Sequence, residues 1–185
     1  VREGILKREV CPSMRLLWSS GKAARKMHAT AYNCAYLAPT SWRDLSEIMY
    51  VSMCGAGCGF SVEPENVEQF PQIQKQTGKR APKIMVEDSK IGWCNAFVEA
   101  CEAWASGHDV DIDYSLVRPV GARLGTMGGR ASGPAPLQEL MAFTRRKMLG
   151  RQGRRLTTLD VHDIACQIGL IVVAGGVRRS ALISL

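Results

Sequence analysis

Helix-length stretches alternate along this sequence with short apolar runs, and this order strongly limits the folds open to the chain. Residues 93–105 show the helical pattern best, with apolar side chains recurring every three or four positions. Residues 111–117 alternate between polar and apolar side chains, as a half-buried strand does. Helices that alternate with short strands predict an α/β protein with a mostly parallel sheet. The other predicted helices cover residues 13–30, 41–54, 137–149 and 157–168, and the other predicted strands cover 34–38, 60–62 and 181–185.

Local signals mark where two of these helices begin. Ser41 with Asp44, and Thr157 with Asp160, have the spacing of a capping box. Residues 63–90 are polar and interrupted by prolines and a glycine, which predicts a long path over the surface. The length of 185 residues suits a single domain. Because the chain starts without methionine and stops in a strand-like run, we expect it to be a fragment of a longer protein.

The positive charge of the chain is concentrated in one segment. The formal net charge is +7, yet residues 118–155 hold nine Lys/Arg against one acidic residue, Glu139. A local basic segment favours a phosphate-bearing partner, and a solvated helix face is the alternative interpretation.

The cysteines indicate a reducing compartment. Seven are present, an odd number, and no secretory signal precedes them, so we expect reduced thiols in a cytosolic protein. Cys54 and Cys58 form the only tight pair, whereas a structural zinc ion needs four ligands, so we expect no metal site. The longest wholly apolar run, residues 170–174, is too short to cross a bilayer, and no membrane partner is expected.

Two glycine-rich segments contain arginine. Residues 125–134 precede the predicted helix 137–149 and include Arg130, and residues 175–179 end in two arginines. Free backbone N–H groups and guanidinium forks suit phosphate, although ordinary turns have the same composition.

Cys34 opens the predicted strand 34–38. Strand ends in α/β folds are where sites form, so a redox or nucleophilic thiol is one interpretation, and a buried core thiol is the other. The alternate glycines within residues 54–59 favour a backbone that turns sharply or lets a ligand approach closely.

Seven short segments, in this order, span nearly the whole chain and resemble the monomeric, adenosylcobalamin-dependent (class II) ribonucleoside-triphosphate reductases. The family's proteins are larger, so the resemblance covers only their N-terminal part. The segments are 12–15 (PSMR), 32–36 (YNCAY), 54–63 (CGAGCGFSVE), 113–119 (DYSLVRP), 121–124 (GARL), 128–134 (GGRASGP) and 172–181 (VVAGGVRRSA).

The resemblance implies a fold and a substrate site. The chain would form part of the family's ten-stranded α/β barrel, with its first strand at Cys34. Cys34 matches one of two cysteines that supply electrons and become a disulfide. The residues that would line the ribonucleotide pocket are Ser13, Asn33, Gly55, Gly57 and Gly59.

The resemblance also implies allosteric control. A deoxyribonucleoside triphosphate effector would bind within the basic region 118–155, and residues 63–110 would be a surface insertion that lets a monomer imitate a dimer contact. Leu182 stands where the family pattern leads us to expect an acidic residue. The implied effector-binding residues are Arg118, Arg123, Arg130 and Ser132, and those of the loop that links effector to substrate are Gly175, Gly176, Arg178 and Arg179.

The implied activity is reduction of ribonucleoside triphosphates by a thiyl radical, with adenosylcobalamin as cofactor and a thioredoxin-like reductant. The radical cysteine, the second redox cysteine and much of the cobalamin site are expected beyond this sequence, so the chain alone should be inactive. The alternative is a nucleotide- or RNA-binding module whose cysteines are structural. If the chain is part of a reductase, we expect no direct nucleic-acid binding.

Overall fold

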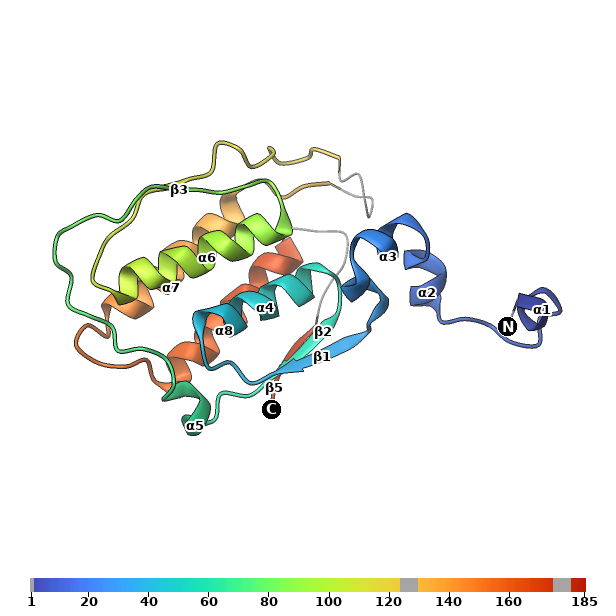
Figure 1. Ribbon diagram of the computed structural model, residues 1–185, viewed down its shortest axis with the longest axis horizontal. Coiled ribbons are helices and arrows are strands. Elements are labelled where there is room, and N and C mark those ends of the chain that lie inside the picture. Colours follow the sequence, from blue (N-terminus) through green and yellow to red (C-terminus); the bar gives the residue numbers. More distant parts are fainter. Residues whose placement is uncertain (1, 124–129, 175–180) are drawn as a thin grey trace.

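A small parallel sheet lies under a layer of helices in the computed structural model, which describes residues 2–123, 130–174 and 181–185 (Figure 1). Strand β2 (Gly57–Phe60) lies between β1 (Cys34–Leu37) and β5 (Leu182–Ser184), and both pairings are parallel. A second parallel pair, β3 (Ile84–Met85) and β4 (Ile112–Asp113), lies beside the helices. The predicted α/β class with parallel strands is confirmed.

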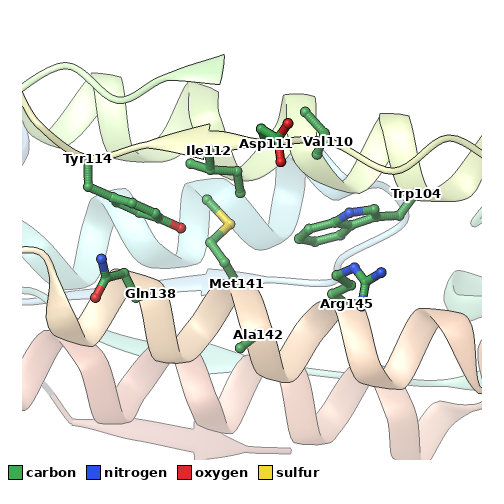
Figure 2. A pocket seen from close by; sticks show the side chains of 9 residues that line it. All are labelled: Trp104, Val110, Asp111, Ile112, Tyr114, Gln138, Met141, Ala142 and Arg145. Atoms are coloured by element: carbon green, nitrogen blue, oxygen red, sulfur yellow. The ribbon is translucent and has the colours of Figure 1, made fainter. Parts of the chain in front are cut away.

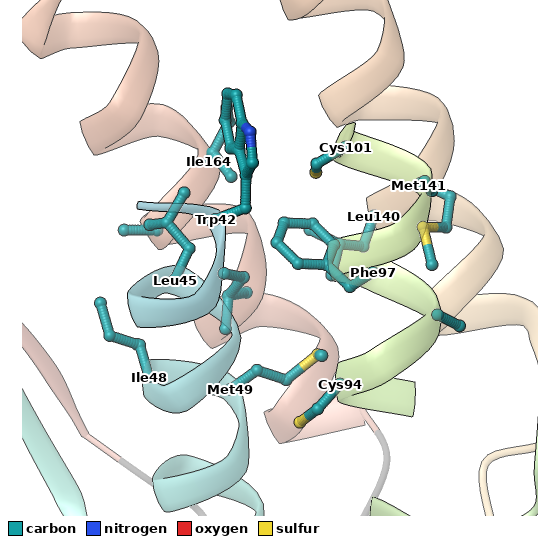
Figure 3. Packing of buried hydrophobic residues seen from close by; sticks show 14 of the residues in the cluster. Trp42, Leu45, Ile48, Met49, Cys94, Phe97, Cys101, Leu140, Met141 and Ile164 are labelled. Atoms are coloured by element: carbon teal, nitrogen blue, oxygen red, sulfur yellow. The ribbon is translucent and has the colours of Figure 1, made fainter. Parts of the chain in front are cut away.

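Helices α4 (Trp42–Met53) and α8 (Thr158–Ala174) pack on the sheet. Helix α6 (Lys90–Ala105) packs on α4, α7 (Ala135–Leu149) packs on α8, and α6 and α7 contact each other. Their apolar faces meet in one core, where Phe97 of α6 lies between α4 and α7 (Figure 3). The helix predicted at 93–105 is confirmed as the main part of α6, and its two cysteines, Cys94 and Cys101, are buried as the helical spacing indicates.

Hydrogen bonds confirm the two predicted helix starts. The Ser41 hydroxyl accepts a hydrogen bond from the Asp44 backbone N–H at α4. At α8, the Thr157 hydroxyl accepts from the Asp160 N–H, and the Asp160 carboxylate accepts from the Thr157 N–H. Each contact satisfies a backbone donor that the helix itself leaves unpaired.

The predicted helix over residues 13–30 is wrong as one element. The structure has α2 (Met14–Ser19), α3 (Lys22–Lys26) and a 3₁₀ turn, η1 (His28–Ala31), after a separate short helix α1 (Arg2–Leu6). Ser20 is extended, with ψ of 148°, and Gly21 has φ of +94°, a left-handed conformation that glycine adopts readily. The apolar stripe therefore continues across a break in the backbone.

Three other boundaries differ from the prediction. The second strand covers 57–60 rather than 60–62, because Gly57 and Gly59 pair with β1. Strand β4 stops at Asp113, whose carboxylate accepts a hydrogen bond from the Ser115 N–H and turns the chain. Helix α8 continues to Ala174, beyond the predicted end at residue 168.

The polar segment 63–90 contributes to the core as well as to the surface. It contains α5 (Pro64–Val67), and the side chains of Phe70, Ile73 and Val86 are fully buried. Arg155 donates to the carbonyl oxygens of Glu68 and Phe70, which anchors the segment to the end of the basic region. None of the described helices has the length and hydropathy needed to span a membrane.

The cap of α8 supports a prediction about stability. Asp160 is 5% exposed; burial opposes its ionisation, but hydrogen bonds from Arg151 and Thr157 outweigh that effect and lower the pKa of its carboxyl. Asp160→Asn should reduce the free energy of unfolding by about 1–3 kcal/mol at pH 7. Because the folded-state pKa is lowered, this contribution is complete above the pKa of an ordinary aspartate and is lost as pH falls through the folded value. Urea unfolding of both proteins between pH 3 and 7 measures it, and a stability difference that stays constant over that range would contradict the assignment.

Candidate functional site

Cys34 is the first residue of β1 and its thiol is exposed. It pairs in register with Gly57 of β2, and the Gly57 N–H donates to the Asn33 carbonyl oxygen over 2.9 Å. The structure therefore brings together three of the predicted site residues at the amino end of the sheet. The alternative of Cys34 as a buried core thiol is wrong for this structure.

Strand β2 has one face against the helices and one face open. Cys58 and Phe60 are buried on the helix side, whereas Gly57 and Gly59 lie on the other side with Cys34. A Cβ at Gly57 would lie 3.6 Å from the Ala181 carbonyl oxygen, and one at Gly59 would lie 3.3 Å from Leu185 Cδ1. The two glycines therefore let neighbouring chain segments approach the sheet closely beside the thiol.

Gly55 leads into β2, whereas the hydrogen bond of the Ser13 side chain is local to α2. The Ser13 hydroxyl accepts a hydrogen bond from the Leu16 N–H at the start of α2. Gly55 follows the last turn of α4 and has φ of +83°, which allows the sharp turn into β2. The Arg15 Nη2 donates to the Gly55 carbonyl oxygen over 2.8 Å and joins the two segments. Sequence reasoning included Arg15 in a motif but gave it no role.

The buried cysteines are poor nucleophiles. Burial raises the pKa of Cys58 and of Cys94 to about 11, and it raises the pKa of Cys101 further above its usual range. The pKa of Cys54 is also raised by burial, which outweighs the opposing effect of Lys90, whose Nζ lies 3.9 Å from the sulfur. All seven cysteines are free thiols, and the described residues contain no group of three or more His, Cys, Asp or Glu side chains placed to hold a metal ion.

Two of the predicted effector residues, Arg123 and Arg130, pair with each other on either side of residues 124–129. Arg123 and Arg130 face each other in an isolated antiparallel bridge, and Arg130 Nη1 donates to the Gly121 carbonyl oxygen. The Ser132 hydroxyl donates to the Gly133 carbonyl oxygen. Residues 124–129, between the two arginines, are outside the described residues, as are Gly175, Gly176, Arg178 and Arg179.

Arg118 is engaged elsewhere. Its Nε donates to Asp88 Oδ2 over 2.7 Å, and both side chains are about one-third exposed. This ion pair attaches the start of the basic region to the loop before α6. Within the described residues, Arg118 therefore has a structural role, separate from the Arg123–Arg130 pair.

Tertiary structure neutralises much of the basic segment. Its cations pair with carboxylates that lie outside residues 118–155 in the sequence. The pairs besides Arg118–Asp88 are Arg145–Asp109, Lys147–Asp163 and Arg151–Asp160. These four ion pairs reduce the local charge excess, so the value of +8 overstates the positive charge that the segment can offer to a phosphate-bearing partner.

An open pocket of about 260 Å³ lies between β4 and α7 (Figure 2). Trp104 and Met141 form part of its apolar lining, and Tyr114, whose pKa burial raises to about 12, lies at one end. None of the predicted site residues lines it.

Comparisons with known proteins found relatives that match nearly the whole chain. No family model matches the chain. The chain is 31% identical over 189 residues to an adenosylcobalamin-dependent ribonucleoside-triphosphate reductase of Euglena gracilis, a match that covers 97% of this chain and 26% of the relative. It is 28% identical to the enzyme of the same name from Lacticaseibacillus paracasei, with 94% of this chain and 31% of the relative covered.

A solved structure shares the fold. It is the crystal structure of a B12-dependent (class II) ribonucleotide reductase, which superposes with a TM-score of 0.83 at 21% identity, over 98% of this chain and 33% of that one. The chain thus spans about a quarter to a third of the length of the proteins it matches. By its similarity to these relatives, the chain belongs to the family of adenosylcobalamin-dependent ribonucleoside-triphosphate reductases.

Proposed function

We propose that this chain is part of an enzyme that reduces ribonucleoside triphosphates to deoxyribonucleoside triphosphates. The supporting observation is the position of Cys34, an exposed thiol at the amino end of β1 on the same open face as Gly57 and Gly59. The two relatives reported above are named for this activity. A ribose seated against the glycine backbone would lie next to the thiol.

The electron balance defines what Cys34 does. Replacing the 2′-hydroxyl of ribose by hydrogen takes two electrons and releases water. Cys34 and a second thiol, supplied outside this chain, each give one electron and join in a disulfide. A thioredoxin-like dithiol then reduces that disulfide by thiol–disulfide exchange and becomes oxidised itself.

The cofactor of the two relatives, adenosylcobalamin, supplies the radical that starts such a reaction, because no side chain generates one unaided. The pocket described above does not fit this cofactor. The pocket between β4 and α7, at about 260 Å³, is below the range of roughly 300–1,000 Å³ typical of pockets for drug-sized ligands, and a corrinoid is larger than those. We expect its site in the remainder of the enzyme.

The finer architecture follows from the same proposal. The β1–β2–β5 sheet would be part of a ten-stranded barrel, and residues 63–110 would be an insertion through which a monomer imitates a dimer contact. The enzyme would act in the cytoplasm, where its thiols stay reduced.

The direct test is an assay of the full-length reductase that carries this chain. With adenosylcobalamin, a dithiol reductant and a ribonucleoside triphosphate, it should form the corresponding deoxynucleotide, detected by chromatography. Absence of product from a folded, cofactor-loaded protein would refute the proposed function.

Effector binding is predicted to depend on the paired residues Arg123 and Arg130. A deoxyribonucleoside triphosphate would be held by Arg123 and Arg130, and the 175–180 loop would carry its effect to the substrate. Removing either guanidinium by substitution with alanine should weaken effector binding by about 1.5–3 kcal/mol. Calorimetric titration of the full-length enzyme measures this, with Arg154→Ala, an exposed arginine of the same basic segment, as the matched control. Unchanged effector affinity in both Arg123→Ala and Arg130→Ala would show that these two arginines do not bind the effector.

A further inference from the structure

Arg15 is placed between two segments that border the Cys34 face. Its side chain is partly buried, and its Nη2 donates to the Gly55 carbonyl oxygen across 40 residues of sequence. Its own carbonyl oxygen accepts a hydrogen bond of 2.7 Å from the Ser19 hydroxyl, which holds the backbone of α2 at this point. The Gly55 contact therefore positions the guanidinium, and the Ser19 contact holds the main chain of Arg15 in α2.

The other terminal nitrogen of Arg15 is buried but has no partner. Among the described residues, no acceptor lies within hydrogen-bond distance of Nη1. Buried donors in native proteins are nearly always satisfied, and an unsatisfied charged donor is costlier than a neutral one. Guanidinium forks bind phosphate and carboxylate with two parallel hydrogen bonds. An anionic acceptor would satisfy Arg15 Nη1, and the described part of the chain does not supply one.

The position of Arg15 relative to Cys34 suits a nucleotide. Gly55, which Arg15 contacts, lies two residues before Gly57, and Gly57 is the register partner of Cys34. Two residues span at most about 7 Å, and neighbouring strands are about 4.8 Å apart. The Arg15 contact is therefore within about 12 Å of the Cys34 backbone, a distance that a ribose with its attached phosphates can bridge.

We propose that Arg15 is a substrate-binding residue, whose Nη1 donates to a phosphate oxygen of the nucleotide while Nη2 holds the Gly55 turn. This inference rests on the proposed function, because it assumes that the ribose lies at Cys34. Helix α2, which carries Arg15, would then bind the phosphate end of the substrate. The sugar would lie beside Cys34, and Arg15 sets the direction of the phosphates.

The test compares substrate kinetics in the full-length reductase. Arg15→Met should raise the KM for the ribonucleoside triphosphate by about tenfold or more, as loss of a charge-assisted hydrogen bond does, with a smaller effect on kcat. Arg15→Lys keeps the positive charge but loses the planar guanidinium. Its KM should lie between those of the wild type and Arg15→Met. Arg43→Met removes an exposed arginine of α4 and should leave KM unchanged.

Two further measurements separate the explanations. Inorganic tripolyphosphate should compete with substrate in the wild type and much less in Arg15→Met, because the shared chemistry is the phosphate anion. The nucleotide should also slow iodoacetamide labelling of Cys34 in the wild type, and Arg15→Met should need about tenfold more nucleotide for the same protection.

The outcomes are distinct. A wild-type enzyme that forms no deoxynucleotide refutes the proposed function itself. An active wild type with equal KM and equal protection in all three variants overturns the role of Arg15. If Arg15→Lys lowers kcat and thermal stability but leaves KM unchanged, Arg15 only supports the Gly55 turn. That result would also overturn the proposed substrate-binding role of Arg15.

Discussion

Cys34→Ser is expected to abolish multiple turnover of the full-length reductase with a thioredoxin-like reductant. A serine hydroxyl cannot form a disulfide, so the two electrons needed for each ribose have no source in the protein. Formation of the substrate radical should persist, because it is assigned to a different cysteine outside this chain. Deoxynucleotide formation and cleavage of the cobalt–carbon bond should both be followed, since the variant is expected to lose the first and keep the second.

Controls separate a redox role from a general loss of thiols. Cys166→Ser changes another exposed cysteine, on α8, and should leave turnover intact. The 185-residue chain alone should show no reductase activity, because one redox cysteine cannot complete a cycle. Normal deoxynucleotide production by Cys34→Ser would show that Cys34 is not one of the two redox cysteines.

Phe97→Ala should lower the free energy of unfolding by about 3–5 kcal/mol. Phe97 is fully buried in α6, and Figure 3 places its ring among side chains of α4 and α7, including Met49 and Leu140. Removing the ring loses its transfer free energy and leaves a cavity that the packed helices cannot close completely.

The measurement is chemical unfolding followed by circular dichroism, with Ile91→Ala as the matched control. Ile91 lies on the same helix but is 59% exposed, so its truncation should change stability by less than about 0.5 kcal/mol. Equal losses in the two variants would mean that α6 is not the centre of the helix layer.

Short-range patterns predicted much of the architecture correctly. The helical spacing of residues 93–105 and the two capping boxes at Ser41 and Thr157 correspond to observed helices and hydrogen bonds. The strand that begins at Cys34 was also predicted at its correct start. Each of these features depends on side chains within about four residues of one another, and that range is the one over which sequence periodicity carries information.

Other features were decided by residues that are distant in the sequence. Part of the positive charge of the basic segment is neutralised by Asp88, Asp109 and Asp163 from other elements, and no local sequence pattern predicts which carboxylate pairs with which cation. The turn at Ser20 and Gly21 divides the predicted helix 13–30, and Met14 and Leu17 of its apolar stripe are exposed, because local spacing does not determine whether a helix face finds a partner to pack against.

The candidate site also combines features set by local sequence with features set by the tertiary structure. The sequence by itself determined that Cys34 opens a strand and that alternate glycines follow α4, because both are local properties of the chain. Only the tertiary structure paired Cys34 with Gly57 on an open face and brought Arg15 to the Gly55 carbonyl. Strand register and a contact across 40 residues arise from the packing of whole elements, which minimises buried, unpaired polar groups over the entire fold rather than along any one segment.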